Sequence, residues 1–184
     1  MTWIVLALLA GAAAFVVSLY NALVRLRNAS ESAWSDVDVQ LKRRYELVPN
    51  LVETVKGYAS HEKSTFEQVV RARTQAMAAS GPEAKSAAEG GLTATLRSLF
   101  ALAEAYPELK ANQNFLSLQA ELSSLEDAIQ NARRYYNAVV RDLNTRCEAF
   151  PSNLVANGFG FTKKAYFELD DAAERKAPQV SFAS

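Results

Sequence analysis

The sequence predicts an all-α protein in which one N-terminal transmembrane helix continues into an antiparallel four-helix bundle, followed by an aromatic-rich C-terminal tail. Residues 1–24 carry no charged side chain. Along most of the remaining chain, apolar residues recur at spacings of three and four, which is the period of amphipathic helices. No segment shows the strict apolar–polar alternation of a half-buried strand. Glycine and proline number only 7 and 5 in 184 residues, so long helices can form without interruption.

An uncharged segment opens the chain. A bilayer core of about 30 Å needs roughly 20 apolar residues in a helix, so residues 1–24 predict a single-pass membrane anchor. A cleavable signal peptide is the alternative, because Ala10-Gly11-Ala12 resembles a cleavage site. However, no Lys or Arg precedes the run, and the run is longer than a usual signal core. Small residues around Gly11 would let a second helix approach closely, which favours a homo-oligomer.

The charges bear on orientation and on partners. Arg25 and Arg27 follow the apolar run while no basic side chain precedes it, which favours a cytoplasmic bundle. The chain holds 20 Lys and Arg against 20 Asp and Glu. It therefore lacks the basic excess of a nucleic-acid binder, and we expect no nucleic-acid partner. A single cysteine, Cys147, excludes an internal disulfide.

The bundle is expected over residues 25–149, with two long helices of equal length over about 22–57 and 112–147. Pro49 falls inside the first and predicts a kink near Tyr45, because proline removes one backbone hydrogen bond. The seam of the second helix alternates spacings of three and four over four heptads. Its members are Phe115, Leu118, Leu122, Leu125, Ile129, Ala132, Tyr136, Val139 and Leu143.

A shorter helical hairpin is expected between the two long helices. Gly57 breaks the first helix and Ser60 could cap a new one that runs to about Ala79, although an unbroken helix through both is the alternative. Its inward residues would be Phe66, Val69, Val70 and Met77. Ser80-Gly81-Pro82 is a strong stop. A weaker helix then begins at Glu83, with an interruption at Gly90-Gly91 and an end at Tyr106-Pro107.

A basic residue falls on the apolar seam of the first helix. Arg44 lies between Leu41 and Val48. If the two long helices are antiparallel, the level of Arg44 on the second helix is near residue 125. The acidic residues at that level are Glu121, Glu126 and Asp127. A buried ion pair that fixes the register is one interpretation, and an Arg that extends to the bundle surface is the other.

The last segment, residues 150–184, is rich in aromatic residues. Because the second long helix returns towards the membrane, we expect this segment to pack near the bundle base or the lipid surface. Its aromatic residues are Phe150, Phe159, Phe161, Tyr166, Phe167 and Phe182.

Catalytic patterns are missing from the sequence. The chain has one histidine, His61, and one cysteine, and neither has a partner at the spacing of a metal site or a catalytic triad. We therefore expect no enzyme activity, no metal and no cofactor.

Four segments together resemble the LemA family of bacterial membrane-anchored helical proteins. They are Leu19–Asn28, which continues into Ala33–Arg44; Leu47–Tyr58; Asn114–Leu122; and Asn131–Asn137, which is followed by Phe150-Pro151-Ser152-Asn153. The match runs in order along nearly the whole chain.

The resemblance implies an antiparallel helical bundle behind one membrane span, and it implies no reaction. Genes of family members often lie beside genes for membrane metalloproteases or other membrane proteins, and one branch of the family is associated with making bacterial membrane compartments. Some members carry a lipoprotein cysteine before the Tyr-Asn pair. Here that position is Ser18, so lipid attachment is not available. Those lipoprotein relatives would place the same bundle outside the cytoplasm, which leaves an extracytoplasmic position open.

We therefore expect a non-enzymatic scaffold that self-assembles at the bacterial cell membrane in membrane organisation or envelope maintenance. The alternative is an adaptor or accessory subunit of a membrane metalloprotease or another envelope enzyme. The candidate interaction or structural residues are Gly11, Trp34, Arg44, Pro49, Asn50, Arg133, Arg134, Tyr135, Tyr136, Phe150 and Pro151.

Overall fold

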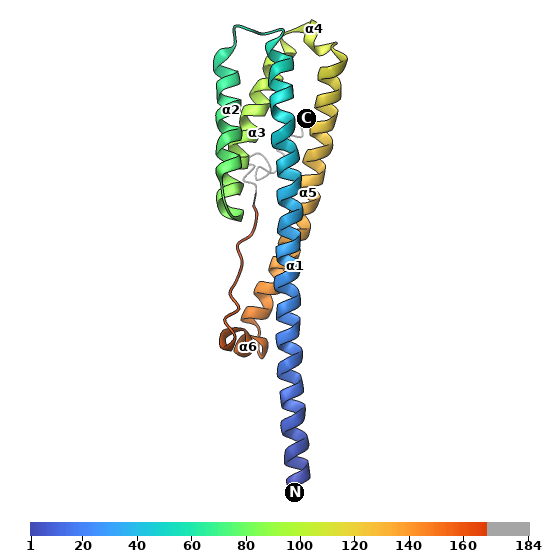
Figure 1. Cartoon of the computed structure of the whole chain (residues 1–184), viewed down its shortest axis with the longest axis vertical. Helices are drawn as coiled ribbons and strands as arrows, with labels where there is room; N and C mark the ends of the chain where they lie inside the picture. The colour runs from blue at the N-terminus through green and yellow to red at the C-terminus, as the bar shows by residue number, and fades with distance from the viewer. Residues whose placement is uncertain (169–184) are drawn as a thin grey trace, which may run out of the picture. The chain divides into compact units, whose positions relative to one another are not determined.

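The computed structural model describes residues 1–168 of the chain, and within them every regular element is a helix (Figure 1). The elements in order are α1 (Thr2–Lys56), α2 (Lys63–Ala78), α3 (Pro82–Glu104), α4 (Pro107–Lys110), α5 (Gln113–Glu148) and α6 (Ser152–Gly158). This confirms the all-α class and a long N-terminal apolar helix. Phe182 of the aromatic-rich tail lies outside the described residues.

The chain divides into two compact units. The first combines Met1–Arg44 with Ser123–Tyr166, and the second contains Tyr45–Leu122 and, among the described residues, Phe167 and Glu168. Both long helices, α1 and α5, contribute residues to each unit.

The helix α1 is a single element of 55 residues, which is longer than either its apolar run or its amphipathic part alone. It continues past the exposed Pro49 and ends at Lys56, directly before Gly57. The amides of Tyr58 and Ala59 both donate to the carbonyl of Val55, at 3.0 Å each, and so satisfy a carbonyl at the helix end. α1 and α2 are therefore separate helices, and an unbroken helix through both is excluded.

The helix α2 begins later than the sequence suggested. Ser60 is not its cap: the residue before the first turn is Glu62, which makes no side-chain capping hydrogen bond. Two expected inward residues, Val70 and Met77, are about half exposed, and Ala72 and Ala76 are buried instead. The buried stripe is Phe66, Val69, Ala72 and Ala76, at spacings of three, three and four, so Val70 and Met77 fall beside it on the solvent side.

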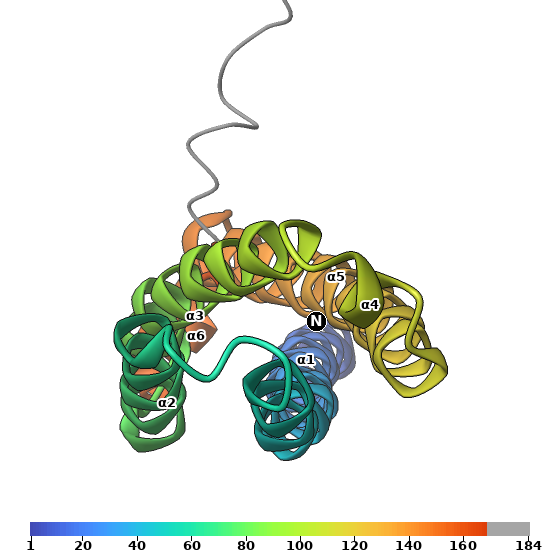
Figure 2. The same cartoon turned by 90° about the horizontal axis from the view of Figure 1, so that it is seen from above.

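Figures 1 and 2 both show α2 and α3 side by side in the second unit. Gly81, at φ +80°, lies at their junction in a left-handed conformation that glycine adopts at little cost, and Pro82 starts α3. The expected interruption at Gly90-Gly91 is absent from α3, which runs through both glycines. The stripe of Leu92, Leu96 and Leu99 is buried, and that burial outweighs the low helix propensity of the two glycines.

The helix α5 differs from its predicted range by one residue at each end. Asn112 caps its start, because the side-chain carbonyl accepts a hydrogen bond from the Phe115 amide at 3.0 Å. The Ser152 hydroxyl lies 2.7 Å from the Arg146 carbonyl and 2.9 Å from that of Ala149, next to the C-terminal end of α5. All nine residues of the predicted seam are buried or half-buried.

Candidate membrane-proximal site

The first part of α1 has only exposed residues. Residues 1–18 are all exposed, and α1 is the one helix in the described part of the chain that is long and apolar enough to cross a membrane. A side-chain carbon added at Gly11 would meet nothing within 4 Å. The length, composition and exposure of this stretch support a location at a membrane.

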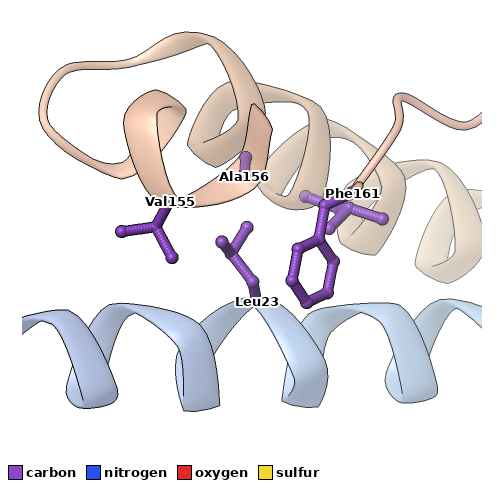
Figure 3. Close-up of a cluster of buried hydrophobic side chains, with 5 residues drawn as sticks. Leu23, Val155, Ala156 and Phe161 are labelled. Carbon is purple, nitrogen blue, oxygen red and sulfur yellow. The ribbon is translucent and has the colours of Figure 1, made fainter. Parts of the chain in front are cut away.

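The character of α1 changes at Leu23. Its side chain is fully buried in a group that also contains Leu143 of α5, Val155 and Ala156 of α6, and Phe161, which we call the Leu23 cluster (Figure 3). Half-buried residues pack around the cluster: Leu19, Tyr20, Val24, Leu26 and Cys147. The segment after α5 therefore folds back against α1 where the fully exposed stretch ends.

Aromatic rings cover the same turn of α1. The Tyr20 ring lies 4.9 Å from the Phe159 ring and 5.7 Å from the Phe161 ring, measured between centroids. The Arg27 guanidinium lies 5.2 Å from the centroid of the Phe161 ring, within the range of a cation–π interaction. Both of these rings from beyond α6 thus contact α1 within two turns of Leu23.

After α6, an extended segment runs along α5. The Asn144 side chain binds the backbone of Lys164 twice: its amide donates to the carbonyl and its oxygen accepts from the N–H, each at 2.9 Å. The Tyr136 hydroxyl donates to the Ala165 carbonyl at 2.9 Å. Lys164 also pairs with Glu31 of α1 at 3.2 Å. These bonds replace the backbone partners that an extended strand would find in a sheet.

Two of the predicted residues meet in this unit. The rings of Trp34 and Tyr136 lie 5.3 Å apart, centroid to centroid. Burial raises the pKa of the Tyr136 hydroxyl, because the phenolate form would lose hydration there. Tyr136 therefore remains a hydrogen-bond donor to the Ala165 carbonyl at neutral pH.

Arg44 is buried, with 1% of its side chain exposed, and it pairs with Glu126 at 2.9 Å. Glu126 is one of the three acidic residues that the sequence predicted to lie level with Arg44 on the second long helix. The Arg44 side chain therefore does not extend to the surface. Within this unit, α1 and α5 are therefore in contact at two levels, through Trp34 with Tyr136 and through Arg44 with Glu126.

The second unit contains a cluster of buried polar side chains around Tyr45 that was not predicted from the sequence. The Tyr45 hydroxyl hydrogen-bonds to the carboxylate of the fully buried Glu89, and the Arg73 Nε donates to the Tyr45 carbonyl at 2.7 Å. The Lys85 ammonium lies 5.5 Å from the Tyr45 ring centroid. A signal was available: Lys85 and Glu89 extend the stripe of Leu92, Leu96 and Leu99 by spacings of four and three.

The remaining candidate residues are not brought together. Arg134 binds the side chain of Asn131 on its own helix, and Arg133 is half-buried. Tyr135 and Phe150 are exposed, at 58% and 79%. Pro49 and Asn50 lie on the exposed face of α1, and Pro151 follows a cis peptide bond. Within residues 1–168, no group of three or more His, Cys, Asp or Glu side chains could hold a metal ion.

The chain is similar in sequence to proteins named MamQ and to a protein named LemA. It is 26% identical to the magnetosome protein MamQ 2 of Paramagnetospirillum magneticum over 190 residues, which cover 88% of this chain and 70% of that protein. It is 25% identical to the magnetosome protein MamQ of Magnetospirillum gryphiswaldense, covering 91% and 73%. The identity to protein LemA of Metamycoplasma hominis is 28%, with 82% and 69% covered.

The sequence model of the LemA family matches residues 33–182, which is most of the chain. That range includes α1 from Ala33 onward, all of α5 and the segment that closes the Leu23 cluster. The chain is thus a membrane-associated helical protein that belongs to the LemA family.

Proposed function

We propose that this protein is a non-enzymatic, membrane-anchored helical scaffold that self-assembles at the bacterial membrane and helps to organise it. The continuity of α1 carries the proposal. Its exposed apolar stretch and the buried Leu23 belong to one uninterrupted helix. The anchor and the remainder of the first unit, which we call the body, therefore move together. The magnetosome proteins among the relatives support a role of this kind.

In this proposal the helices form an antiparallel four-helix bundle. The pairing of Trp34 with Tyr136 and of Arg44 with Glu126 supports it within the first unit. Such a bundle is held by long apolar seams and leaves its outer helix faces available to other copies.

Self-assembly is expected to begin in the membrane. Gly11 is exposed in open space and is followed by three alanines, and small residues let two helices approach closely in lipid. The mass of the full chain in detergent, measured by light scattering over a concentration series, tests this. We expect an oligomer that Gly11→Leu weakens and that the matched exposed substitution Leu8→Ile leaves unchanged. A monomer at every concentration would refute self-assembly.

The orientation is proposed from the charges, with the body in the cytoplasm. Val39 is exposed on α1 beyond the anchor, so a Val39→Cys variant in a Cys147→Ala background reports its side of the membrane. An impermeant maleimide should label this cysteine only after the membrane is opened. Labelling of intact spheroplasts would place the body outside instead.

Electron tomography of membranes that contain the overproduced protein tests the scaffold role directly. Ordered arrays or altered curvature are expected in the native chain and not in a control that lacks residues 1–24. Crosslinking in the same membranes separates the two functional hypotheses. Self-crosslinks support the scaffold, and crosslinks dominated by a membrane enzyme support the adaptor.

A further inference from the structure

Two uncharged segments of this chain lie against each other. The first is residues 1–24, and residues 149–162 form the longest other run without a charged side chain. The second run contains α6 and supplies three members of the Leu23 cluster, which joins it to α1. Distant parts of the sequence without charge thus meet at the end of the exposed apolar stretch.

The second run buries one side and exposes the other. Val155, Ala156 and Phe161 are buried, whereas Phe150, Leu154 and Phe159 are exposed at 79%, 63% and 61%. These three large, exposed apolar side chains fall within ten residues, and we call them together the α6 surface. Three side chains are too few for a stable protein interface, which buries about 1,200–2,000 Å² in total.

The position of the α6 surface along α1 indicates what covers it. From Trp3 to Tyr20 the helix rises about 26 Å at 1.5 Å per residue, which is close to the thickness of a bilayer core. Phe159 contacts Tyr20, so the α6 surface lies at the level where this span would leave the hydrocarbon. Aromatic residues favour that level.

The surrounding charges suit lipid headgroups. Arg25 and Arg27 follow the apolar run on α1, and the first acidic residue of the chain is Glu31. Arg27 lies over the Phe161 ring and is exposed. Basic side chains beside an apolar surface are the pattern by which interfacial helices bind anionic membranes.

We propose that the α6 surface is a second membrane contact, in which Phe150, Leu154 and Phe159 enter the headgroup–acyl boundary beside the anchor. The inference rests on the proposed membrane span of α1. Together the two contacts would fix the body against the membrane at two points, which restrains its tilt and rotation about α1.

Depth-dependent fluorescence quenching tests the proposal. The full chain carries Cys147→Ala and one new cysteine, Leu154→Cys, labelled with an environment-sensitive dye and reconstituted into phosphatidylcholine–phosphatidylglycerol vesicles. Matched variants are Leu8→Cys in the exposed apolar stretch and Val39→Cys on α1, about 28 Å beyond Tyr20. All three replace exposed residues, and circular dichroism checks that each variant keeps its helix content.

Quenching by lipids with a nitroxide near the headgroup is expected to be about threefold greater at Leu154 than at Val39, while Leu8 responds best to a deeper nitroxide. A response at Leu154 equal to that at Val39, with Leu8 still quenched, would overturn the second contact and leave the anchor intact. No lipid quenching at Leu8 or Leu154 would remove the anchor as well. A Leu154 dye shielded from lipid and from aqueous iodide would show that protein covers the surface, which also overturns the proposal.

Discussion

The two parts of α1 are equally helical and have opposite surroundings. Residues 1–18 are mostly apolar and all exposed, whereas from Leu23 onward most apolar residues form a buried stripe, with Val39 exposed beside it. A helix that is apolar all round needs an apolar environment, and a striped one needs a protein partner. The transition falls at the Leu23 cluster, so four residues near the end of the predicted anchor already pack against protein: Leu19, Tyr20, Leu23 and Val24.

A leucine-to-alanine substitution should have the most different effects on stability in the two parts of α1. Leu23→Ala removes a fully buried side chain and should lower the free energy of unfolding by about 4 kcal/mol, or about 10 °C in Tm. Leu9→Ala, at a 62% exposed position, should leave Tm nearly unchanged. Thermal unfolding of the full chain in detergent, followed by circular dichroism, measures both. Equal losses would show that the exposed stretch also packs within the chain.

A charged substitution should have a large effect in the exposed part of α1 and little effect in the striped part, the reverse of a substitution to alanine. Leu9→Arg places a cation in the predicted hydrocarbon region and should cost about 3 kcal/mol of membrane insertion. Val39→Arg, on an exposed position of the striped part, should have no effect on insertion. The fraction of protein that resists carbonate extraction from membranes measures this difference. If Leu9→Arg stays fully embedded, residues 1–18 do not span the bilayer.

The buried part of α1 also contains a charge, Arg44. Glu126→Ala removes the carboxylate 2.9 Å from it and should cost about 2 kcal/mol, which is less than for a fully buried pair because Glu126 is partly exposed. Glu121→Ala, on an exposed residue of the same helix, should change Tm little. An apolar pair avoids the cost of burying a charge. The double variant Arg44→Met with Glu126→Leu should therefore have a higher Tm than the single variant Glu126→Ala. The reverse order would show that the ion pair is needed for stability.

The smallest effect is expected at Cys147, which packs against the Leu23 cluster. Burial raises the pKa of its thiol, and the charge of Glu148 adds to the rise while Lys163 opposes it. The folded chain therefore favours the neutral thiol. This preference stabilises the fold at pH values below the pKa of Cys147 in the unfolded chain, and the stabilisation is lost as pH rises through the pKa in the folded chain.

Maleimide labelling at pH 8 reports this shift. It should be a few-fold slower at Cys147 in the folded chain than in denaturant, and slower than at an exposed Val39→Cys. Leu23→Ala should reduce the difference, because it opens the cluster. Equal rates in the folded and denatured chain would contradict a buried thiol.

The helices could be predicted because their signals are local. The range 112–147 expected for the second long helix differs from α5 by one residue at each end, and Gly57 marks the end of α1. The level of Arg44 on α5 could also be predicted, because a rise of 1.5 Å per residue holds along both helices. Local signals failed at Ser60, because α2 starts only at Lys63. They also failed at Gly90-Gly91, where a cost of about 1 kcal/mol for each glycine is outweighed by the buried leucine stripe of α3.

The sequence by itself determined the apolar run, the seams and the absence of a recognisable catalytic motif, because composition and periodicity are properties of neighbouring residues. Only the tertiary structure decided that the segment around α6 covers Leu23 and that Glu89 and Lys85 are buried beside Tyr45. Periodicity shows which face of a helix is buried and not which partner buries it. Those partners lie far apart in the chain, so the complementarity of the packed surfaces in shape and charge selects them, and local periodicity does not.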